Sequence, residues 1–219
     1  MKIIITEKQH DKLIKRNIEE DYPINWNVEE FRKLKSFSSR KQYCDKNLIR
    51  ISSGSSRVVY KIDETKVLKL AKNKKGLAQN EIEIDFSKDF MWGGIVAKIF
   101  NYDENNLWVE MELARKLTPK IFEEITGLNF EEYGNGLKYY KSKTGNNTNP
   151  YKPSKPDSYD DMWENEFSYD IFNLIGGYDI NVGDLTKMNT YGVVNRNGED
   201  EVVMIDYGLT NKVYDSYYG

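Results

Sequence analysis

The amino-acid sequence predicts an α+β protein of two lobes: a five-stranded antiparallel sheet that carries one helix, then a reduced, mainly helical lobe. Three observations predict this class. Between residues 48 and 113, short runs rich in Val, Ile, Leu and Tyr alternate with turn-rich segments, as is typical of antiparallel strands. Between residues 119 and 175, apolar residues recur at helical spacing. The chain has 219 residues, of which 39% are hydrophobic and 13% aromatic, which is enough to bury a core.

The first 47 residues are mostly polar with scattered aromatic anchors, and we expect an extension that packs on the lobe that follows. The capping pattern Thr6-Glu7-Lys8-Gln9 after an apolar start predicts a short strand and then a helix within residues 1–16. Residues 28–34 suit a second short helix. The sequence thus divides into an N-terminal extension (1–47), a first lobe (48–113) and a second lobe (114–219).

The first lobe begins with three predicted strands, at residues 48–51, 57–62 and 65–71. The turn Ser52-Ser53-Gly54-Ser55-Ser56 joins the first two, and its small side chains would let backbone amides approach an anion closely. In the third strand, alternation places Lys69 on the same face as Val67 and Ala71. A lysine on the inner face of a sheet needs an anionic partner.

The next segments offer that partner and complete the sheet. Residues 76–90 have a helical pattern and carry two candidate carboxylates, Glu81 and Glu83. We favour Glu83, but helical phase alone leaves both open. A hairpin formed by residues 95–100 and 107–113, with a polar turn between them, would add the fourth and fifth strands.

The second lobe is predicted to be mainly helical. Thr118-Pro119 suits the start of a helix over residues 120–140. Residues 141–161 are rich in Lys, Ser, Gly, Asn and Pro and predict a long exposed loop. Residues 162–175 then form a helix that Gly176-Gly177 ends.

Two motifs near the end of the sequence carry the strongest functional signal. In Gly183-Asp184-Leu185-Thr186-Lys187-Met188-Asn189, an amide follows an acid by five positions, and an apolar run then leads into Asp206-Tyr207-Gly208. Mg²⁺ prefers oxygen ligands and usually sits between carboxylates and substrate phosphates. Asn189 and Asp206 are therefore candidate metal ligands, and Asp184 would face an attacking hydroxyl. Each motif alone is also ordinary turn chemistry.

Together, in this order and spacing, the motifs resemble the catalytic core of the protein-kinase-like superfamily. The Gly183-Asp184 pair is similar to the aminoglycoside-kinase branch, whose catalytic loop reads H-G-D-x-x-x-x-N. Val182 stands at the position of the family's histidine, which supports the loop and does no chemistry. The resemblance implies a kinase-like fold, ATP and Mg²⁺ as cofactors, and Asp184 as the catalytic base.

The resemblance also implies roles upstream. Lys69 would hold the α- and β-phosphates and pair with Glu83. Gly54 matches the middle glycine of the family's G-x-G-x-x-G loop, with Ser52 and Arg57 at the flanking positions, where Arg57 would add a charge over the phosphates. The hinge, whose backbone groups bind adenine in the family, would comprise Glu110, Met111 and Glu112 and end at Leu113.

Two interpretations of function remain open. The first is an ATP- and Mg²⁺-dependent phosphotransferase of reduced kinase-like fold, whose unknown acceptor is a small molecule, a protein or the chain itself. The second is a catalytically silent kinase-fold protein with a structural or binding role, such as a component of a phage particle, in line with the phage-like start Met1-Lys2-Ile3-Ile4-Ile5-Thr6. The sequence ends eleven residues after Gly208, so we expect no platform for a peptide substrate.

Composition argues against other classes. A net charge of -3 gives no general attraction to nucleic acid or anionic lipid. No run approaches the roughly twenty apolar residues that span a bilayer, so we expect a protein of the cytoplasm, namely the host cytoplasm or the virion if it is phage-encoded. Cys44 and His10 are the only residues of their kinds, which excludes an internal disulfide and argues against a Cys/His zinc site.

Overall fold

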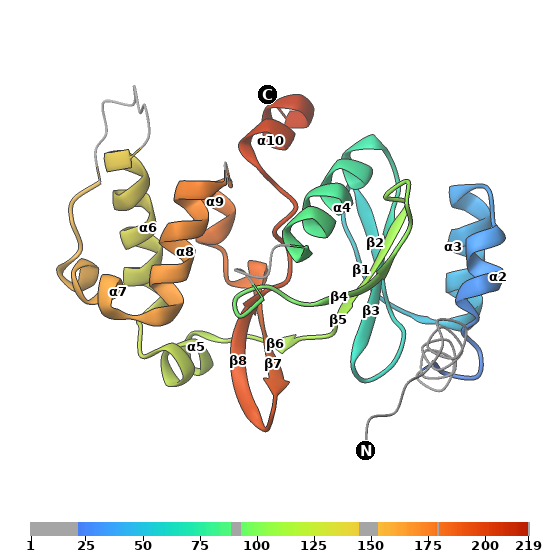
Figure 1. Cartoon of the computed structure of the whole chain (residues 1–219), viewed down its shortest axis with the longest axis horizontal. Helices are drawn as coiled ribbons and strands as arrows, with labels where there is room; N and C mark the ends of the chain where they lie inside the picture. Colours follow the sequence, from blue (N-terminus) through green and yellow to red (C-terminus); the bar gives the residue numbers. More distant parts are fainter. Residues whose placement is uncertain (1–21, 89–92, 145–152, 179, 219) are drawn as a thin grey trace, which may run out of the picture.

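The computed structural model describes residues 22–88, 93–144, 153–178 and 180–218. Within these residues, a sheet flanked by helices on both faces lies beside a mainly helical part that carries a second, smaller sheet (Figure 1). The predicted α+β class is confirmed. The strand and helix expected within residues 1–16 lie outside the described residues.

The larger sheet has five antiparallel strands, as predicted, and their order is β1-β2-β3-β5-β4. Its strands are β1 (Ile49–Ser53), β2 (Arg57–Lys61), β3 (Lys66–Ala71), β4 (Ile99–Tyr102) and β5 (Trp108–Glu112). The fourth strand starts later than expected, because the backbone at Val96 bridges to Met204 of the second sheet instead of continuing β4.

One helix, α4 (Lys74–Ser87), packs on the face of this sheet that adjoins the second part (Figure 1). Asn73 caps it by accepting a hydrogen bond from the Gly76 N–H. A Cβ at Gly76 would lie 2.3 Å from the Ser56 carbonyl oxygen. Glycine at this position therefore allows the first turn of α4 to pack closely against the turn that joins β1 and β2.

The opposite face of the sheet is covered by α2 (Val28–Lys33) and α3 (Phe37–Asn47), which the structure places where the extension was expected to pack. The core between them is apolar and largely aromatic, and includes Trp26, Phe31, Cys44, Tyr60, Leu68 and Trp108. Burial raises the pKa of the Cys44 thiol to about 12, so this side chain stays protonated and acts as a small hydrophobe.

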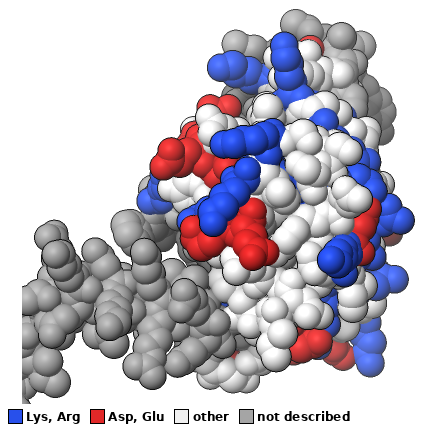
Figure 2. Space-filling model, turned by 90° about the vertical axis from the view of Figure 1, so that its right-hand side faces the viewer, with Lys and Arg blue, Asp and Glu red and all other residues white. Residues whose placement is uncertain are grey.

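Figure 2 shows the side of the molecule that carries α2 and α3. Lysine and arginine side chains are interspersed there with aspartate and glutamate, and no broad area of one sign appears among the described residues. That distribution agrees with the low net charge. In the described part of the chain, no helix has both the length and the apolar character needed to cross a membrane.

The second part contains α5 (Pro119–Thr126), α6 (Phe130–Thr144), α7 (Asp161–Glu164), α8 (Glu166–Gly177), α9 (Val182–Leu185) and α10 (Asn211–Tyr218). The single helix expected over residues 120–140 is split, because Gly127 adopts a left-handed conformation with φ +73° and ends α5. Asn165 similarly separates α7 from α8, where its side chain accepts a hydrogen bond from the Ser168 N–H.

The long loop expected over residues 141–161 is shorter than predicted. Helix α6 continues through Thr144, and a 3₁₀ turn, η2 (Asp157–Tyr159), precedes α7. Residues 145–152 lie outside the described part of the chain.

A three-stranded antiparallel sheet is the main element that the sequence did not predict in full. It comprises β6 (Arg115–Lys116), β7 (Tyr191–Arg196) and β8 (Glu199–Met204). Of these strands, only β8 overlaps a segment that the sequence singled out, the apolar run before Asp206. The turn between β7 and β8 is Asn197-Gly198, with φ values of +56° and +90°. An Asn-Gly pair between two strands is a strong hairpin signal, and it would have revealed β7.

Candidate functional site

A cleft of about 510 Å³ is lined by residues of β1, β2, β3 and β5 and by loops of the second part. Most of the predicted site residues line it, namely Gly54, Lys69, Met111, Glu112, Asp184, Asn189 and Asp206. Six segments of the chain contribute these residues. The fold therefore brings together residues that are far apart in the sequence.

Lys69 lies at the inner wall of the cleft, on the same face of β3 as Val67. Its Nζ donates a hydrogen bond to Glu83 Oε1 at 2.9 Å and another to the Ile205 carbonyl oxygen at 2.5 Å. Glu83 is fully buried, whereas Glu81 is exposed, so the structure selects Glu83 between the two candidates. Burial lowers the pKa of Lys69, and the neighbouring Glu83 carboxylate partly opposes this effect.

Arg57 reaches deeper than the sequence suggested. Only 7% of it is exposed, and its Nη1 lies 2.8 Å from the second oxygen of Glu83, Oε2. Its Nη2 donates a hydrogen bond to Asp206 Oδ1 at 2.6 Å, and Nη1 also donates to Asn80 Oδ1 at 3.3 Å. Arg57 was expected over the phosphates; the structure instead shows its buried guanidinium paired with Glu83 and Asp206.

Asp206 follows β8 and opens into the cleft, with 57% of its side chain accessible. Its surroundings disfavour the charged form, but the positive charges of Arg57 and Lys69 outweigh that effect and hold the pKa of Asp206 below its ordinary value. Asp206 is therefore an anion at neutral pH.

The two residues after Asp206 fix the position of its loop. The Tyr207 hydroxyl donates a hydrogen bond to the Ala97 carbonyl oxygen at 3.1 Å, and its ring packs edge-on against Phe86 of α4. A Cβ at Gly208 would lie 2.4 Å from the Gln79 carbonyl oxygen, so glycine permits close packing on α4. Because α4 also carries Glu83, this contact sets the distance between Glu83 and Asp206.

Asp184 and Asn189 come from the short helix α9 and the 3₁₀ turn η3 (Met188–Thr190). Asp184 accepts a hydrogen bond from Lys187 Nζ at 2.5 Å, a contact that the sequence did not predict. Thr190 joins the two loops of the site: its Oγ1 donates to the Asp184 carbonyl oxygen at 2.7 Å, and its own carbonyl oxygen accepts from the Ile205 N–H.

Val182, at the position where the kinase-like resemblance would put a histidine, is buried in the core of the second part. A hydrophobic side chain thus occupies the position next to the Gly183-Asp184 pair. Asn181 supplies part of the local support, because its side-chain oxygen accepts a hydrogen bond from the Gly183 N–H at 2.9 Å.

Within the predicted hinge, the side chain of Glu110 points away from the cleft. This side chain lies on the opposite face of the sheet, fully buried, where its carboxylate accepts a hydrogen bond from the Tyr22 hydroxyl. It does not line the cleft because alternate residues of a strand point to opposite faces, and Met111 points into the cleft.

The hinge backbone is partly committed to the protein itself. The Glu112 N–H donates to the Lys98 carbonyl oxygen at 2.8 Å, and the Leu113 N–H donates to the Thr65 carbonyl oxygen at 2.7 Å. The Glu112 carboxylate is held by Arg196, whose Nη2 lies 2.7 Å from Oε2. Within the predicted hinge, the N–H groups of Glu112 and Leu113 are therefore already used.

Gly54 lies at the turn above Lys69 and Arg57. Its φ is not in the left-handed region, and a Cβ built there would meet no atom within 4 Å. The turn is held from the side by Lys72, whose Nζ donates to the Gly54 carbonyl oxygen at 2.5 Å and to Ser53 Oγ at 2.8 Å. The conformation of the turn does not itself require glycine, and there is open space beside it for a ligand.

The pair Asn189 and Asp206 has the right donor atoms for Mg²⁺, one amide and one carboxylate. However, Oδ1 of Asp206 is bound to the buried guanidinium of Arg57. Among the described residues, no group of three or more His, Cys, Asp or Glu side chains converges on a common point. The site as it stands does not fit a resident magnesium ion.

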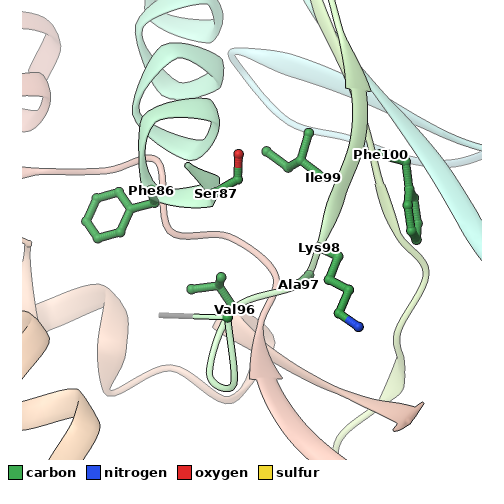
Figure 3. A pocket seen from close by; sticks show the side chains of 8 residues that line it. Phe86, Ser87, Val96, Ala97, Lys98, Ile99 and Phe100 are labelled. Atoms are coloured by element: carbon green, nitrogen blue, oxygen red, sulfur yellow. The ribbon is translucent and has the colours of Figure 1, made fainter. Parts of the chain in front are cut away.

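A second cavity, of about 200 Å³, lies between the end of α4 and the start of β4 (Figure 3). Its lining is mainly apolar, with Phe86, Val96 and Ile99 around it. None of the predicted site residues borders this cavity.

Neither a protein-family model nor a curated protein matches the sequence. Among solved structures, the chain is similar to three aminoglycoside phosphotransferase structures. For the ternary complex of APH(2″)-IIa with streptomycin and ATP, the TM-score is 0.29 at 13% identity, over 64% of this chain and 38% of that one. For ADP-bound APH(2″)-Ib, the TM-score is 0.36 at 13% identity, and the match covers 77% of this chain and 69% of that one. For the gentamicin complex of APH(2″)-IIa, the TM-score is 0.34 at 10% identity, and the match covers 80% of this chain and 70% of that one.

The match to the first of these structures thus spans less than half of that protein's length. The fold described above rests on the chain's own strands, helices and contacts.

Proposed function

We propose that the protein binds a nucleotide in the cleft and transfers its terminal phosphoryl group to an acceptor hydroxyl, as a kinase-like phosphotransferase. The observation that carries this proposal is the convergence of Lys69, Asp184, Asn189 and Asp206 on one cleft, with Lys69 held by the buried Glu83. The Lys69 side chain lines this open cleft, where its positive charge would attract an anionic ligand.

The phosphate end of such a ligand would lie between the Gly54 turn and Lys69. The turn offers open space beside Gly54, and Lys69 lies below it with its positive charge. Phosphoryl transfer depends mainly on positioning and on stabilising the charge of the transferred group, which these groups would supply. Adenine would lie against Met111 at the other end of the cleft, with ATP as the expected nucleotide.

Asp184 would act on the acceptor. The acceptor oxygen forms a bond to the γ-phosphorus while the bond from that phosphorus to the β,γ-bridging oxygen breaks, so that ADP leaves. The hydroxyl proton passes to the Asp184 carboxylate. Lys187, 2.5 Å from Asp184 and largely exposed, would orient this carboxylate before the acceptor arrives.

The proposed transfer assigns no step to the predicted Mg²⁺, because Asp206 is already paired with Arg57. If an ion enters, Asn189 and Asp206 are the residues that would hold it. Its chemistry would be to neutralise charge on the phosphate oxygens.

The acceptor is the open part of the proposal. The neighbouring structures hold streptomycin and gentamicin, which makes aminoglycosides convenient test compounds without arguing for them. A protein acceptor and transfer to the chain itself are the other candidates.

A second candidate function is a nucleotide-binding or structural protein of kinase-like fold without turnover. The Arg57–Asp206 pair favours it, because a carboxylate that serves a metal in kinases here serves an arginine. A role in a phage particle stays a prediction, since the start of the sequence lies outside the described residues.

The test combines binding and transfer. ATP should raise the melting temperature of the protein, and labelled γ-phosphate should appear on an acceptor from a panel of aminoglycosides, proteins and the chain itself. Lys69→Met should weaken ATP binding by at least tenfold, and Asp184→Asn should abolish transfer while ATP still binds. Lys116→Met, at an exposed position of β6, serves as the matched control.

The outcomes separate the two candidates. Failure of the wild-type chain to bind ATP would contradict both the phosphotransferase and nucleotide-binding proposals. Binding without transfer to any acceptor would favour the silent protein. Transfer that survives Asp184→Asn would show that Asp184 is not the base.

A further inference from the structure

We propose that Arg57 and a divalent cation compete for Asp206, so that Arg57 sets the metal affinity of the cleft. The inference rests on the proposed function for the identity of the cleft's ligand, but the competition itself can be measured without a nucleotide. It explains why the predicted metal ligands line the cleft in a geometry that does not fit a resident ion.

The first step is the position of Arg57. It is the first residue of β2, directly after the Gly54 turn, and its backbone pairs with Ala71 of β3. Its side chain spans from the sheet to the loop after β8, with Glu83 2.8 Å from Nη1 and Asp206 2.6 Å from Nη2. The guanidinium therefore links the two parts of the molecule.

The second step is the distribution of charge. Glu83 uses one oxygen for Lys69 and the other for Arg57, so two cations share one buried carboxylate. Asp206 supplies the second negative charge, and the four groups together are neutral. Without Asp206, the two buried cations would exceed their anions by one, and burial of an unpaired charge is costly. This group therefore favours Arg57 on Asp206 whenever no other cation is present.

The third step is access. Only 8% of the Arg57 side chain is exposed, whereas 57% of the Asp206 side chain is exposed in the cleft. A metal ion from solvent can thus reach the carboxylate of Asp206, whereas Arg57 and Lys69 are shielded from solvent. A Mg²⁺ ion binds a carboxylate oxygen at about 2.0–2.1 Å, so at Oδ1 it would lie within about 5 Å of the guanidinium. Two positive charges at that separation repel, and Asn189 supplies no negative charge to compensate.

A consequence follows for the nucleotide. Arg57 already neutralises the negative charge of Asp206. The phosphates of a nucleotide would therefore meet no unpaired carboxylate at the inner end of the cleft. The binding of a nucleotide should then depend little on divalent ions. Removal of the arginine would expose the carboxylate, and phosphates would then need an ion between themselves and Asp206.

The test measures Mn²⁺ binding by electron paramagnetic resonance on the full chain without nucleotide. Arg57→Gln should bind Mn²⁺ at least tenfold more tightly than the wild type. The double variant with Arg57→Gln and Asp206→Asn should lose that gain. Arg115→Gln is a matched control, because Arg115 also pairs with an aspartate, Asp200, at an Nη2–Oδ2 distance of 2.5 Å, but on the surface. It should leave the Mn²⁺ affinity unchanged.

A second variant covers the case in which Arg57→Gln does not fold. Arg57→Lys keeps the charge but cannot reach both carboxylates through a forked group, and it should show an intermediate gain in Mn²⁺ affinity. Circular dichroism identifies the folded variants. Equal Mn²⁺ affinity in the wild type and in the folded Arg57 variants would overturn the proposal, as would a gain that persists in the double variant.

A nucleotide titration adds an independent readout. The affinity of the wild type for a fluorescent ATP analogue should change less than threefold between EDTA and excess Mg²⁺, whereas Arg57→Gln should lose at least tenfold in EDTA. A wild type that needs Mg²⁺ as much as the variant does would contradict the proposal. If no variant binds the analogue at all, the proposed function fails, and the Mn²⁺ comparison still decides whether Arg57 competes for Asp206.

Discussion

The two faces of the five-stranded sheet bury different kinds of side chain, although the same strands build both. On the face covered by α2 and α3, Leu68 and Trp108 pack against Phe31 in an apolar core. On the face toward the second part, Lys69 and Arg57 lie in a group of buried charges. Adjacent residues of β3 thus belong to an apolar core and to an ionic site.

This difference between the two faces shows that they are stabilised by different interactions. The apolar face is stabilised by burial of hydrocarbon and does not depend on any one partner's charge. The cleft face depends on matched charges, so loss of one member leaves another unpaired in a buried position. Removing side chains from each face should therefore have different signatures.

The largest expected effect is on the apolar face. Phe31 is fully buried and contacts the rings of Trp26, Tyr43 and Trp108. Phe31→Ala should lower the free energy of unfolding by about 3–5 kcal/mol, because it leaves a cavity among these rings. Urea denaturation measures the change, with Tyr217→Ala, at an exposed aromatic position, as the control. A loss below about 1 kcal/mol would mean that α2 is not integral to the fold.

The next effect is on the cleft face. Glu83→Gln leaves Lys69 and Arg57 sharing only Asp206, and should lower the free energy of unfolding by about 3 kcal/mol. Glu81→Gln, two positions earlier on the exposed side of α4, should change it by less than about 0.5 kcal/mol. Similar losses in the two variants would contradict the ionic character of this face.

A smaller effect is expected where the cleft loop meets α4. Gly208→Ala would place a Cβ 2.4 Å from the Gln79 carbonyl oxygen, and the backbone must shift to relieve the contact. We expect a loss of about 1–3 kcal/mol in the free energy of unfolding.

Gly54→Ala is the matched control, since no atom lies within 4 Å of its Cβ position. It should leave stability nearly unchanged while weakening nucleotide binding, because the methyl group would occupy the space beside the turn. A destabilised Gly54→Ala, or a Gly208→Ala as stable as the wild type, would contradict the packing described here.

The sequence predicted the parts of the site that follow from local periodicity. Alternation in β3 placed Lys69 on the inner face, and the helical segment after it supplied Glu83. The same alternation in β5 turns the Glu110 side chain to the face opposite that of Met111, which lines the cleft. This concerns the side chain alone, and the hinge role expected of the Glu110 backbone stays a prediction.

Other features depend on contacts between distant segments. The pairing of Arg57 with Asp206 joins the start of β2 to the loop after β8, and no local pattern indicates which carboxylate a long side chain will reach. The contact of Lys187 with Asp184 depends on the turn between them. The division into three domains stays a prediction, as do the roles of the site residues.

The smallest effect distinguishes the two faces by pH. Burial raises the pKa of Glu110, on the apolar face, above its ordinary value of 4.5. Its contribution to stability is therefore present below pH 4.5 and is lost as the pH rises through the raised value. Asp206, on the cleft face, has a lowered pKa, so its contribution is present above its ordinary value of 3.8 and is lost only as the pH falls further.

Between pH 4.5 and 7, substitutions of the two carboxylates should consequently differ in their dependence on pH. Relative to the wild type, Glu110→Gln should gain stability as the pH rises from 4.5 to 7, because it removes a buried charge that the wild type must carry there. Asp206→Asn should show a constant loss over the same interval. Urea denaturation at several pH values measures both, with Glu104→Gln, at an exposed position before β5, as the control. A Glu110→Gln difference that does not vary with pH would mean that Glu110 is already protonated throughout, or that its partners accommodate the charge. In either case the apolar face would be indifferent to pH, and only the cleft face would contain an acid that the fold keeps charged.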